Sequence, residues 1–166
     1  MKYKEAKGKF LQTWGALGSQ WGVNKTMAQI HALLMISGEA LSMEDIMEEL
    51  QISRGNASMN LRGLIDWGII HKEYKPGERR EYFRAEQDID AMARKIAIER
   101  SRREIKPAIQ VLKEVQEVEG TNEEELKFKE KTSELYEFVA KADTMLEKVV
   151  NQKENWITKT ILKLMS

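Results

Sequence analysis

The chain has 166 residues, with no cysteine and only two histidines. It therefore forms no disulfide and no thiolate metal site, and two imidazoles are too few for a structural zinc site, so we expect no cofactor. Its length suits a single folded core that buries about 70% of the unfolded chain's surface. No apolar run is long enough for a membrane span, and the lysine-rich start lacks the apolar region of a signal peptide, which predicts a cytoplasmic protein.

Basic and acidic side chains balance at 27 each, but they are unevenly distributed. Residues 1–25 hold five lysines and one acid, residues 26–50 hold five acids and no lysine or arginine, and residues 51–84 hold seven basic and four acidic side chains. A basic segment beside an acidic one gives a polarised surface, which can orient a protein on an anionic duplex.

Residues 2–21 are predicted to form a helix with two stripes. The apolar stripe contains Tyr3, Phe10, Trp14, Leu17 and Trp21, and a second stripe contains Gly8, Gly15 and Gly22. Each interior glycine costs a helix about 1 kcal/mol relative to alanine, so tertiary packing must hold this helix. Glycine also lets another backbone approach closely. We interpret the aromatic stripe as core or dimer-interface surface in preference to a ligand box.

Asn24 is predicted to cap a second helix, which has a broad apolar face between Met27 and Leu34. His31 lies on this face. A lone histidine without titratable neighbours in the pattern indicates a structural role rather than catalysis. Ser37, Gly38 and Glu39 close the helix.

Residues 41–84 have the pattern of two short helices followed by a β-hairpin. Ser42 and Ser53 are predicted N-caps, and Leu41, Ile46, Met47 and Leu50 recur at helical spacing in the first helix. In the second helix, Ala57, Leu61 and Leu64 form the core face, and Gly68 follows its end. Strands at residues 69–74 and 82–83 are joined by a turn containing Pro76 and Gly77. This is the layout of a winged helix-turn-helix.

The outward face of the second helix indicates DNA binding. Gly55, Ser58, Met59 and Arg62 point away from the core, with Asn56 and Asn60 on the flanks. Arginine suits the N7 and O6 atoms of guanine, and asparagine suits N6 and N7 of adenine. Together with the basic hairpin tip, this predicts the DNA-binding residues Ser53, Arg54, Asn56, Ser58, Asn60, Arg62, Lys75, Arg79 and Arg80.

Two observations keep an alternative open. First, the exposed face of the second helix can be an ordinary solvated surface without a binding function. Second, the first helix carries four acids that must face away from the phosphates if the protein binds DNA: Glu44, Asp45, Glu48 and Glu49. A winged-helix scaffold that binds another protein through this acidic face is the competing hypothesis. An enzyme is disfavoured, because no histidine or paired carboxylate stands in a context for general acid and base catalysis.

The run from Ser53 to Arg62, the pair Trp67-Gly68 and the wing at residues 77–80 resemble the GbsR-type branch of the MarR-like transcriptional regulators. The resemblance covers about the first two thirds of the chain and extends more loosely to the tryptophan-glycine pairs near the N-terminus and to residues 102–107. It implies a dimeric, cytoplasmic, DNA-binding regulator. Known members of that branch govern osmoprotectant genes and respond to choline-like ligands.

The resemblance therefore implies a quaternary ammonium compound as an effector. Aromatic faces attract such cations, which makes Phe10, Trp14, Trp21 and Trp67 the candidate ligand-binding residues. The packing interpretation given above for the aromatic stripe competes with this role.

The rest of the chain is predicted to be helical. Pro107 predicts a kink or helix boundary at residues 104–107, and Thr121 with Glu124 predicts a capping box for a long helix after Gly120. A last apolar segment includes Trp156, Ile157, Ile161, Leu162 and Leu164. The long apolar stripes favour a partner subunit, and so a homodimer, over packing within one lobe.

The sequence thus predicts a mainly α fold with a small β-hairpin wing, built as a winged helix-turn-helix with N- and C-terminal dimerisation helices. We divide it into residues 1–120, the DNA-binding domain with an N-terminal helix and a linker helix, and residues 121–166, a helical dimerisation region. The predicted function is a homodimeric regulator that reads a roughly palindromic operator through the helix at residues 53–67 and the wing at residues 75–80.

Overall fold

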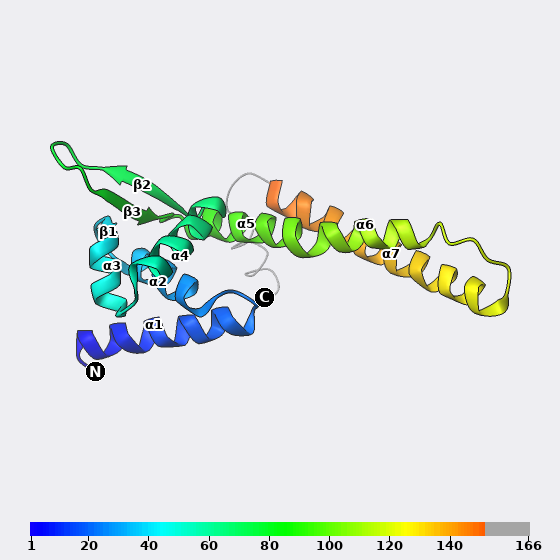
Figure 1. Ribbon diagram of the computed structural model, residues 1–166, viewed down its shortest axis with the longest axis horizontal. Coiled ribbons are helices and arrows are strands. Elements are labelled where there is room, and N and C mark those ends of the chain that lie inside the picture. Colours follow the sequence, from blue (N-terminus) through cyan, green and yellow to red (C-terminus); the bar gives the residue numbers. More distant parts are fainter. Residues whose placement is uncertain (152–166) are drawn as a thin grey trace, which may run out of the picture. The chain divides into compact units, whose positions relative to one another are not determined.

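The computed structural model describes residues 1–151, which form helices and one small sheet (Figure 1). The chain divides into two compact units, Met1–Met92 and Ala93–Ser166. The apolar segment predicted around Trp156 lies outside the described residues. No helix among the described residues has an apolar stretch long enough to cross a bilayer.

Unit 1 contains the helices α1 (Tyr3–Gln20), α2 (Lys25–Ile36), α3 (Met43–Leu50) and α4 (Arg54–Asp66). The three predicted N-caps are confirmed. The Asn24 side chain accepts hydrogen bonds from two backbone amides of α2, and Ser42 Oγ accepts from the amide of Asp45, whose carboxylate in turn accepts from Ser42. Ser53 Oγ accepts from the amide of Asn56 at 3.3 Å. These bonds satisfy amides that the first helical turn leaves unpaired.

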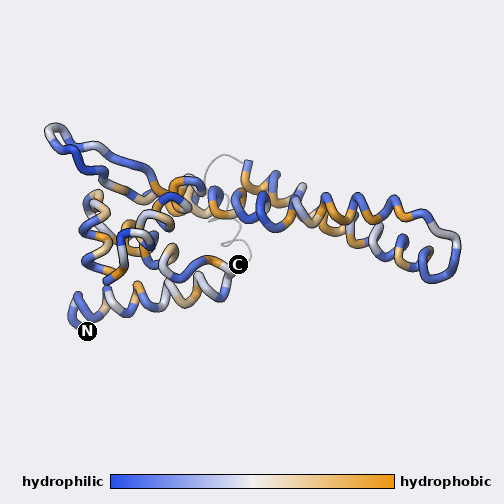
Figure 2. Tube along the Cα trace, viewed as in Figure 1, coloured by the Kyte–Doolittle hydropathy of each residue, from blue (hydrophilic) through white to orange (hydrophobic). Residues whose placement is uncertain are grey.

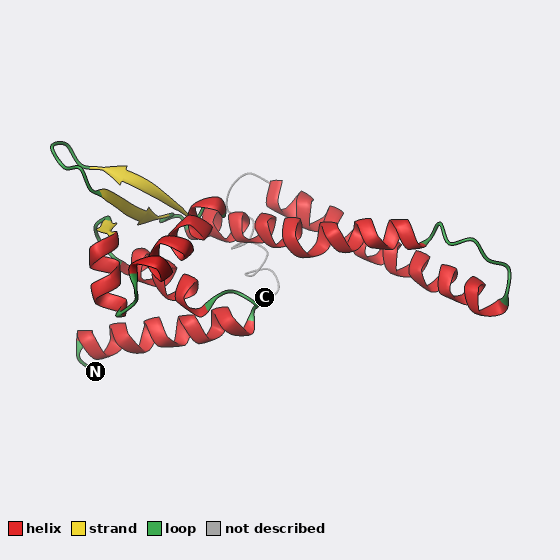
Figure 3. Ribbon diagram, in the orientation of Figure 1, coloured by secondary structure: helices red, strands yellow, loops and turns green. Residues whose placement is uncertain are grey.

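The sheet consists of β1 (Leu41–Ser42), β3 (Glu81–Ala85) and β2 (Ile70–Tyr74) in that spatial order, all antiparallel (Figure 3). The spacing of Leu41 predicted that it belongs to the first short helix, but it lies in β1. Ser42 caps that helix, and Leu41 pairs with Phe83 of β3 instead. The predicted turn at Pro76 and Gly77 is confirmed. Gly77 has φ 81°, and the Glu78 amide donates to the Lys75 carbonyl at 3.1 Å, as in a type II turn.

The core of unit 1 surrounds α2, whose sequence is apolar on most sides (Figure 2). It is completed by α3, α4 and the return strand β3. The most completely buried apolar side chains are Ile30, Ala32, Leu33, Leu34, Ile46, Ala57, Leu61, Leu64, Phe83 and Ala85. His31 is also buried, with 4% of its surface exposed, as its position on the apolar face predicted.

The face of α1 that packs on α2 is not the predicted aromatic stripe. The buried residues of α1 are Leu11, Gly15 and Gly18, whereas Tyr3 and Trp21 are 76% and 55% exposed. A Cβ atom at Gly18 would lie 2.5 Å from Cβ of Ala28, and one at Gly15 would lie 2.7 Å from Cγ of Gln29. The glycines thus allow the close approach that the sequence suggested, and the face that packs on α2 is the glycine side of α1 rather than its aromatic stripe.

The glycine stripe predicted at positions 8, 15 and 22 is correspondingly wrong at two positions. Gly8 has open space where a Cβ would be, and Gly22 lies beyond the helix with φ 76°. Only Gly15 belongs to the contact with α2, and Gly18 is the member that the spacing missed.

Beyond the wing, α5 (Ile89–Arg100) continues through a π-helical turn (Ser101–Ile105) into α6 (Lys106–Val115), and α7 (Glu123–Asn151) runs back along α6 (Figure 1). The predicted boundary near Pro107 is confirmed, since Pro107 lies in the first turn of α6. Inside this hairpin, the buried Ser101 hydroxyl donates to Asp143 of α7 at 2.6 Å, and Lys106 pairs with Glu147 at 3.0 Å.

The capping box of α7 is one residue later than predicted. The Asn122 side chain accepts from the amide of Glu125 at 2.9 Å, and the Glu125 carboxylate accepts from the amide of Asn122 at 3.1 Å. Asparagine caps a helix as well as threonine does, so the pattern allowed both registers. Gly120 lies in the turn between α6 and α7. The division of the chain into two compact units falls between Met92 and Ala93.

Candidate nucleic-acid interface

Helix α4 presents one exposed face, because three apolar side chains fix its rotation against the core. Ala57, Leu61 and Leu64 are buried. The opposite side carries Gly55, Met59 and Arg62, all exposed as predicted, and Met59 has 63% of its surface accessible. A Cβ atom at Gly55 would meet nothing within 4 Å, so the backbone there is open to a close approach. Ser58 and Asn56 are half-buried beside this face.

Asn60 does not lie on the surface, which corrects its assignment as a DNA-reading residue. Only 4% of it is exposed. Its position three residues after Ala57 and four before Leu64 turns it toward the core side. Its side-chain amide donates to the Asn56 carbonyl at 2.8 Å and to Asn56 Oδ1 at 2.6 Å.

Arg54, at the start of α4, is joined to the preceding helix. Its guanidinium donates to Glu44 Oε1 at 2.6 Å, and both side chains remain exposed, at 65% and 47%. This hydrogen bond lowers the pKa of Glu44 below its ordinary value, so the carboxylate stays charged in neutral solution. A nucleic acid that uses Arg54 must therefore compete with Glu44.

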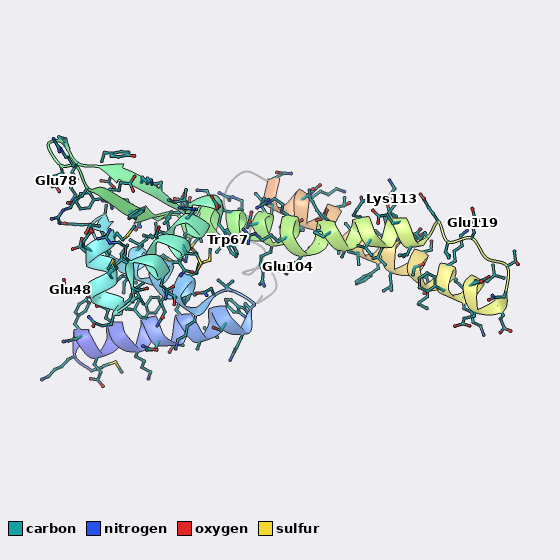
Figure 4. All side chains as sticks on the ribbon, in the orientation of Figure 1. Glu48, Trp67, Glu78, Glu104, Lys113 and Glu119 are labelled. Atoms are coloured by element: carbon teal, nitrogen blue, oxygen red, sulfur yellow. The ribbon has the colours of Figure 1, made fainter. Side chains whose placement is uncertain are left out.

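The acidic face of α3 is largely engaged in contacts within unit 1. Glu49 pairs with Lys7 of α1 at 2.9 Å. Asp45 accepts from the Ser42 hydroxyl, and this bond lowers its pKa. With Glu44 on Arg54, three of the four acids have a cation or a donor. Glu48, the fourth acid of this helix, is exposed (Figure 4).

The wing has ordered strands and a basic tip. Across the strands, Lys72 pairs with Glu81 at 2.6 Å and Arg84 with Glu73 at 2.7 Å. Arg79 and Arg80 at the tip are exposed and form no ion pair with any of the described residues.

The wing turn is held by a cluster of three side chains. Lys75 Nζ lies 4.1 Å from the ring centre of Tyr82, and the Tyr82 hydroxyl donates to Glu78, which raises the pKa of Tyr82 (Figure 4). Lys75 is half-buried in this arrangement. The cluster fixes the loop that carries the two exposed arginines.

The four aromatic residues proposed to bind a ligand are spread over two helices. Phe10 and Trp14 of α1 are half-buried, with ring centres 5.4 Å apart and planes tilted by 35°. Trp21 follows the end of α1, and Trp67 follows the end of α4. No group of three or more histidine, aspartate or glutamate side chains within residues 1–151 is arranged to hold a metal ion.

Sequence reasoning missed one residue of this surface and two side-chain pairings. Met59 was placed on the outward face but not selected, although its spacing between Gly55 and Arg62 carried the signal. Glu44 pairs with Arg54 and Asn60 pairs with Asn56. Glu44 and Arg54 are ten residues apart and lie on separate helices, so the helical periodicity does not indicate their contact. Asn56 and Asn60 have the i, i+4 spacing that allows a hydrogen bond within one helix.

Comparison with known proteins places these elements in a known fold. The model of the MarR family matches residues 21–81, which include α2, α3, α4 and most of the wing. A crystal structure of a transcriptional regulator aligns with a TM-score of 0.68 and 19% identity, over 87% of this chain and 95% of that chain. The DNA-bound structure of a mutant of S. aureus MepR aligns at 13% identity with a TM-score of 0.35, over 98% of this chain and 89% of that chain. No curated protein matches the chain.

The fold is therefore a winged helix-turn-helix, in which residues 21–81 are similar to the MarR family, followed by a helical hairpin. This confirms the predicted mainly α fold with a β-hairpin wing. The dimerisation role assigned to the terminal helices stays a prediction.

Proposed function

We propose that this chain is a DNA-binding transcriptional regulator that acts as a homodimer on a roughly palindromic operator. One observation carries the proposal. The exposed face of α4, which carries Arg62, belongs to the same compact unit as the exposed Arg79 and Arg80 of the wing, while three of the four acids of α3 have partners within that unit.

In this proposal α4 enters the major groove and the wing contacts the flanking phosphates or the minor groove. Gly55 permits a close approach, Arg62 donates to the N7 and O6 atoms of a guanine, and Met59 offers an apolar contact to a thymine methyl group. Arg79 and Arg80 supply charge that does not depend on sequence. The match of residues 21–81 to the MarR family supports the same assignment.

The homodimer is supported by an exposed apolar stripe on α7. Phe128, Leu135, Phe138 and Met145 are between 47% and 72% exposed, and their spacings of seven, three and seven residues follow the heptad repeat of a coiled coil. The helix buries other residues, Thr132 and Asp143, in the described part of the hairpin. A second copy of the chain, packing on the exposed stripe, would remove it from water and bring two α4 helices to one duplex.

A small-molecule effector and membership of the GbsR-type branch belong to the same proposal. Their support is the resemblance of residues 53–80 together with the paired rings of Phe10 and Trp14, whose faces can attract a quaternary ammonium group. Calorimetry with choline and glycine betaine, on the intact protein and on Trp14→Ala, tests this part. Heat that disappears in a folded Trp14→Ala variant supports it, and no heat with either compound removes it.

Selection of bound sequences from a random duplex pool tests the main proposal. We expect a palindrome whose half-sites are about 34 Å apart along the helix axis, or a multiple of that distance. Its affinity should fall by roughly 10³ to 10⁵ between 50 and 200 mM salt, as for 6 to 10 phosphate contacts. Recovery of no enriched sequence, together with flat salt dependence, would instead favour the protein-binding scaffold.

A further inference from the structure

The two asparagines of α4 form an arrangement that bears on which base the protein reads. Asn56 is half-buried in the first turn of α4, where a recognition helix meets base edges. Asn60 lies one turn later and is buried. The side-chain nitrogen of Asn60 is 2.8 Å from the backbone carbonyl oxygen of Asn56 and 2.6 Å from its side-chain oxygen.

This geometry fixes the orientation of both side-chain amides. A backbone carbonyl oxygen can only accept, so the Asn60 atom beside it is the NH₂ group. That group has two hydrogens, and the second one points to the side chain of Asn56. The Asn56 atom that receives it must then be the carbonyl oxygen, which leaves the NH₂ group of Asn56 on the other branch of its amide, away from Asn60.

We infer that Asn60 is a positioning residue that makes Asn56 a hydrogen-bond donor toward DNA and so sets a preference for guanine over adenine at one position of each half-site. The inference rests on the proposed function. Guanine presents two adjacent acceptors, N7 and O6, in the major groove, and both hydrogens of the Asn56 amide can meet them. Adenine presents one acceptor and one donor.

An unrestrained asparagine favours adenine, because its oxygen accepts from N6 while its nitrogen donates to N7. In this protein the Asn56 oxygen is already bonded to Asn60 and held against the helix. It is therefore a poorer acceptor for adenine N6, and the general expectation of adenine at an asparagine contact is reversed here. The sequence pattern alone, with two exposed asparagines, predicted the adenine contact.

The test measures relative affinities for all four bases at every position of the selected half-site. It uses full-length wild type, Asn56→Ala, Asn60→Ala and the double variant. In wild type we expect one position where guanine is preferred over adenine by at least about fivefold, the lower end of what one paired contact contributes. Asn56→Ala should abolish that preference. Asn60→Ala should shift the same position toward adenine several-fold and leave the position read by Arg62 unchanged.

The double variant separates positioning from general damage to the helix. If Asn60 acts through Asn56, Asn60→Ala changes no base preference in the Asn56→Ala background. Asn60→Ser is a second variant, because its hydroxyl can still donate to the Asn56 carbonyl while releasing the side-chain oxygen. It should shift the preference in the same direction as Asn60→Ala, and circular dichroism checks that each variant is folded.

Three results would overturn the inference: adenine preferred at the Asn56-dependent position in wild type, no position that depends on Asn56, or equal changes at all positions in both Asn60 variants. In each of these cases a palindrome that still depends on Arg62 leaves the proposed function intact. If wild type selects no sequence at all, the proposed function and the inference fail together.

Discussion

Arg62 and Arg79 are both exposed arginines, but they occupy different parts of the proposed interface. Arg62 lies on the face of α4 that would meet base edges, whereas Arg79 lies at the wing tip, where only phosphates or the minor groove are within reach. We expect Arg62→Ala to cost about 1 to 3 kcal/mol at one base position and to relax the preference there. Arg79→Ala should weaken binding to all DNA sequences alike. It should also reduce the slope of log affinity against log salt concentration by about one for each wing that carries the change. If both changes weaken binding to all sequences equally, Arg62 does not contact a base.

Glu44 restrains Arg54 and also places a negative charge near the start of α4. Glu44→Gln keeps the shape of the side chain but weakens its hold on the guanidinium, so Arg54 becomes available to a phosphate. We expect higher affinity for every duplex and a steeper salt dependence, by about one counterion per half-site.

Glu48→Gln is the matched control for this prediction. It removes the same charge from the same helix at an exposed position (Figure 4). Salt titrations of both variants decide the matter. If the two changes raise affinity equally, net charge alone explains the gain, and release of Arg54 contributes nothing.

His31 makes the stability of unit 1 depend on pH. Burial lowers the pKa of His31 to about 4, and its Nε2 has no hydrogen-bond partner among the described residues. Above pH 6.5 the imidazole is neutral in both the folded and the unfolded chain. Below pH 6.5 the unfolded chain binds the proton and the folded one does not, so the free energy of unfolding falls until the folded site protonates near pH 4.

We therefore expect His31→Leu to remove a loss of about 2 kcal/mol between pH 7 and pH 5. Urea unfolding of both proteins at the two pH values measures it. Carboxylates contribute equally to wild type and variant, so the difference between the two proteins isolates His31. A difference that stays constant with pH contradicts the assignment.

At the scale of elements, the contact between α1 and α2 depends on one glycine more than on the others. Gly18→Ala would place a methyl group 2.5 Å from Cβ of Ala28, a backbone-anchored atom that cannot move aside, so we expect a loss of about 1 to 3 kcal/mol. Gly8→Ala on the same helix meets open space and should gain up to about 1 kcal/mol from helix propensity. Urea midpoints give both values. Stabilisation by both changes would show that α1 does not pack closely on α2.

Local signals predicted the helix starts and the wing turn well, because a cap or a turn needs only a few adjacent residues. Asn24, Ser42, Ser53 and Gly77 all act as their chemistry indicates. The rotation of a helix is harder to predict. On α4 three buried apolar residues fix the face, and Asn60 lies on the core side between Ala57 and Leu64, where its amide donates to two oxygens of Asn56.

The aromatic stripe of α1 is not the face that packs on α2, and its role as dimer-interface surface stays a prediction. Large aromatic side chains suggested a buried stripe, whereas close contact of two helix backbones favours the side that has no side chains. Which glycines take part depends on where α2 crosses, and that contact is not encoded in the periodicity of α1. The acids of α3 likewise find Lys7 and Arg54, two partners that lie outside their own helix.

At the scale of the whole molecule, the sequence pattern gave the order of helices in the C-terminal part but not its grouping. Gly120 suggested a boundary because glycine and a helix start follow each other there. In the structure the same residues connect α6 to α7, which pack together in one unit. A turn within a hairpin and a linker between domains have the same local composition, and only the contacts of the flanking helices separate them.

The apolar stripe of α7 allows the homodimer to be tested without removing any part of the chain. Phe138 is 72% exposed at the centre of the stripe, so Phe138→Glu puts a charge into the proposed coiled-coil seam while leaving the contacts of α7 with α6 in place. Wild type should sediment as a dimer at micromolar concentration and the variant as a monomer. Thr144→Glu introduces the same carboxylate at an exposed position off the stripe and should remain a dimer.

The same variants connect assembly to DNA binding. A dimer that holds one half-site presents its second α4 to the other half-site at a high effective concentration, so a palindrome is bound far more tightly than a single half-site. Phe138→Glu should lose this advantage and bind both duplexes with similar affinity, whereas Thr144→Glu should keep it. If wild type is a monomer in solution, the proposed homodimer is wrong. If Phe138→Glu still prefers the palindrome, the stripe on α7 is not the dimer interface, and another surface must join the two copies of α4.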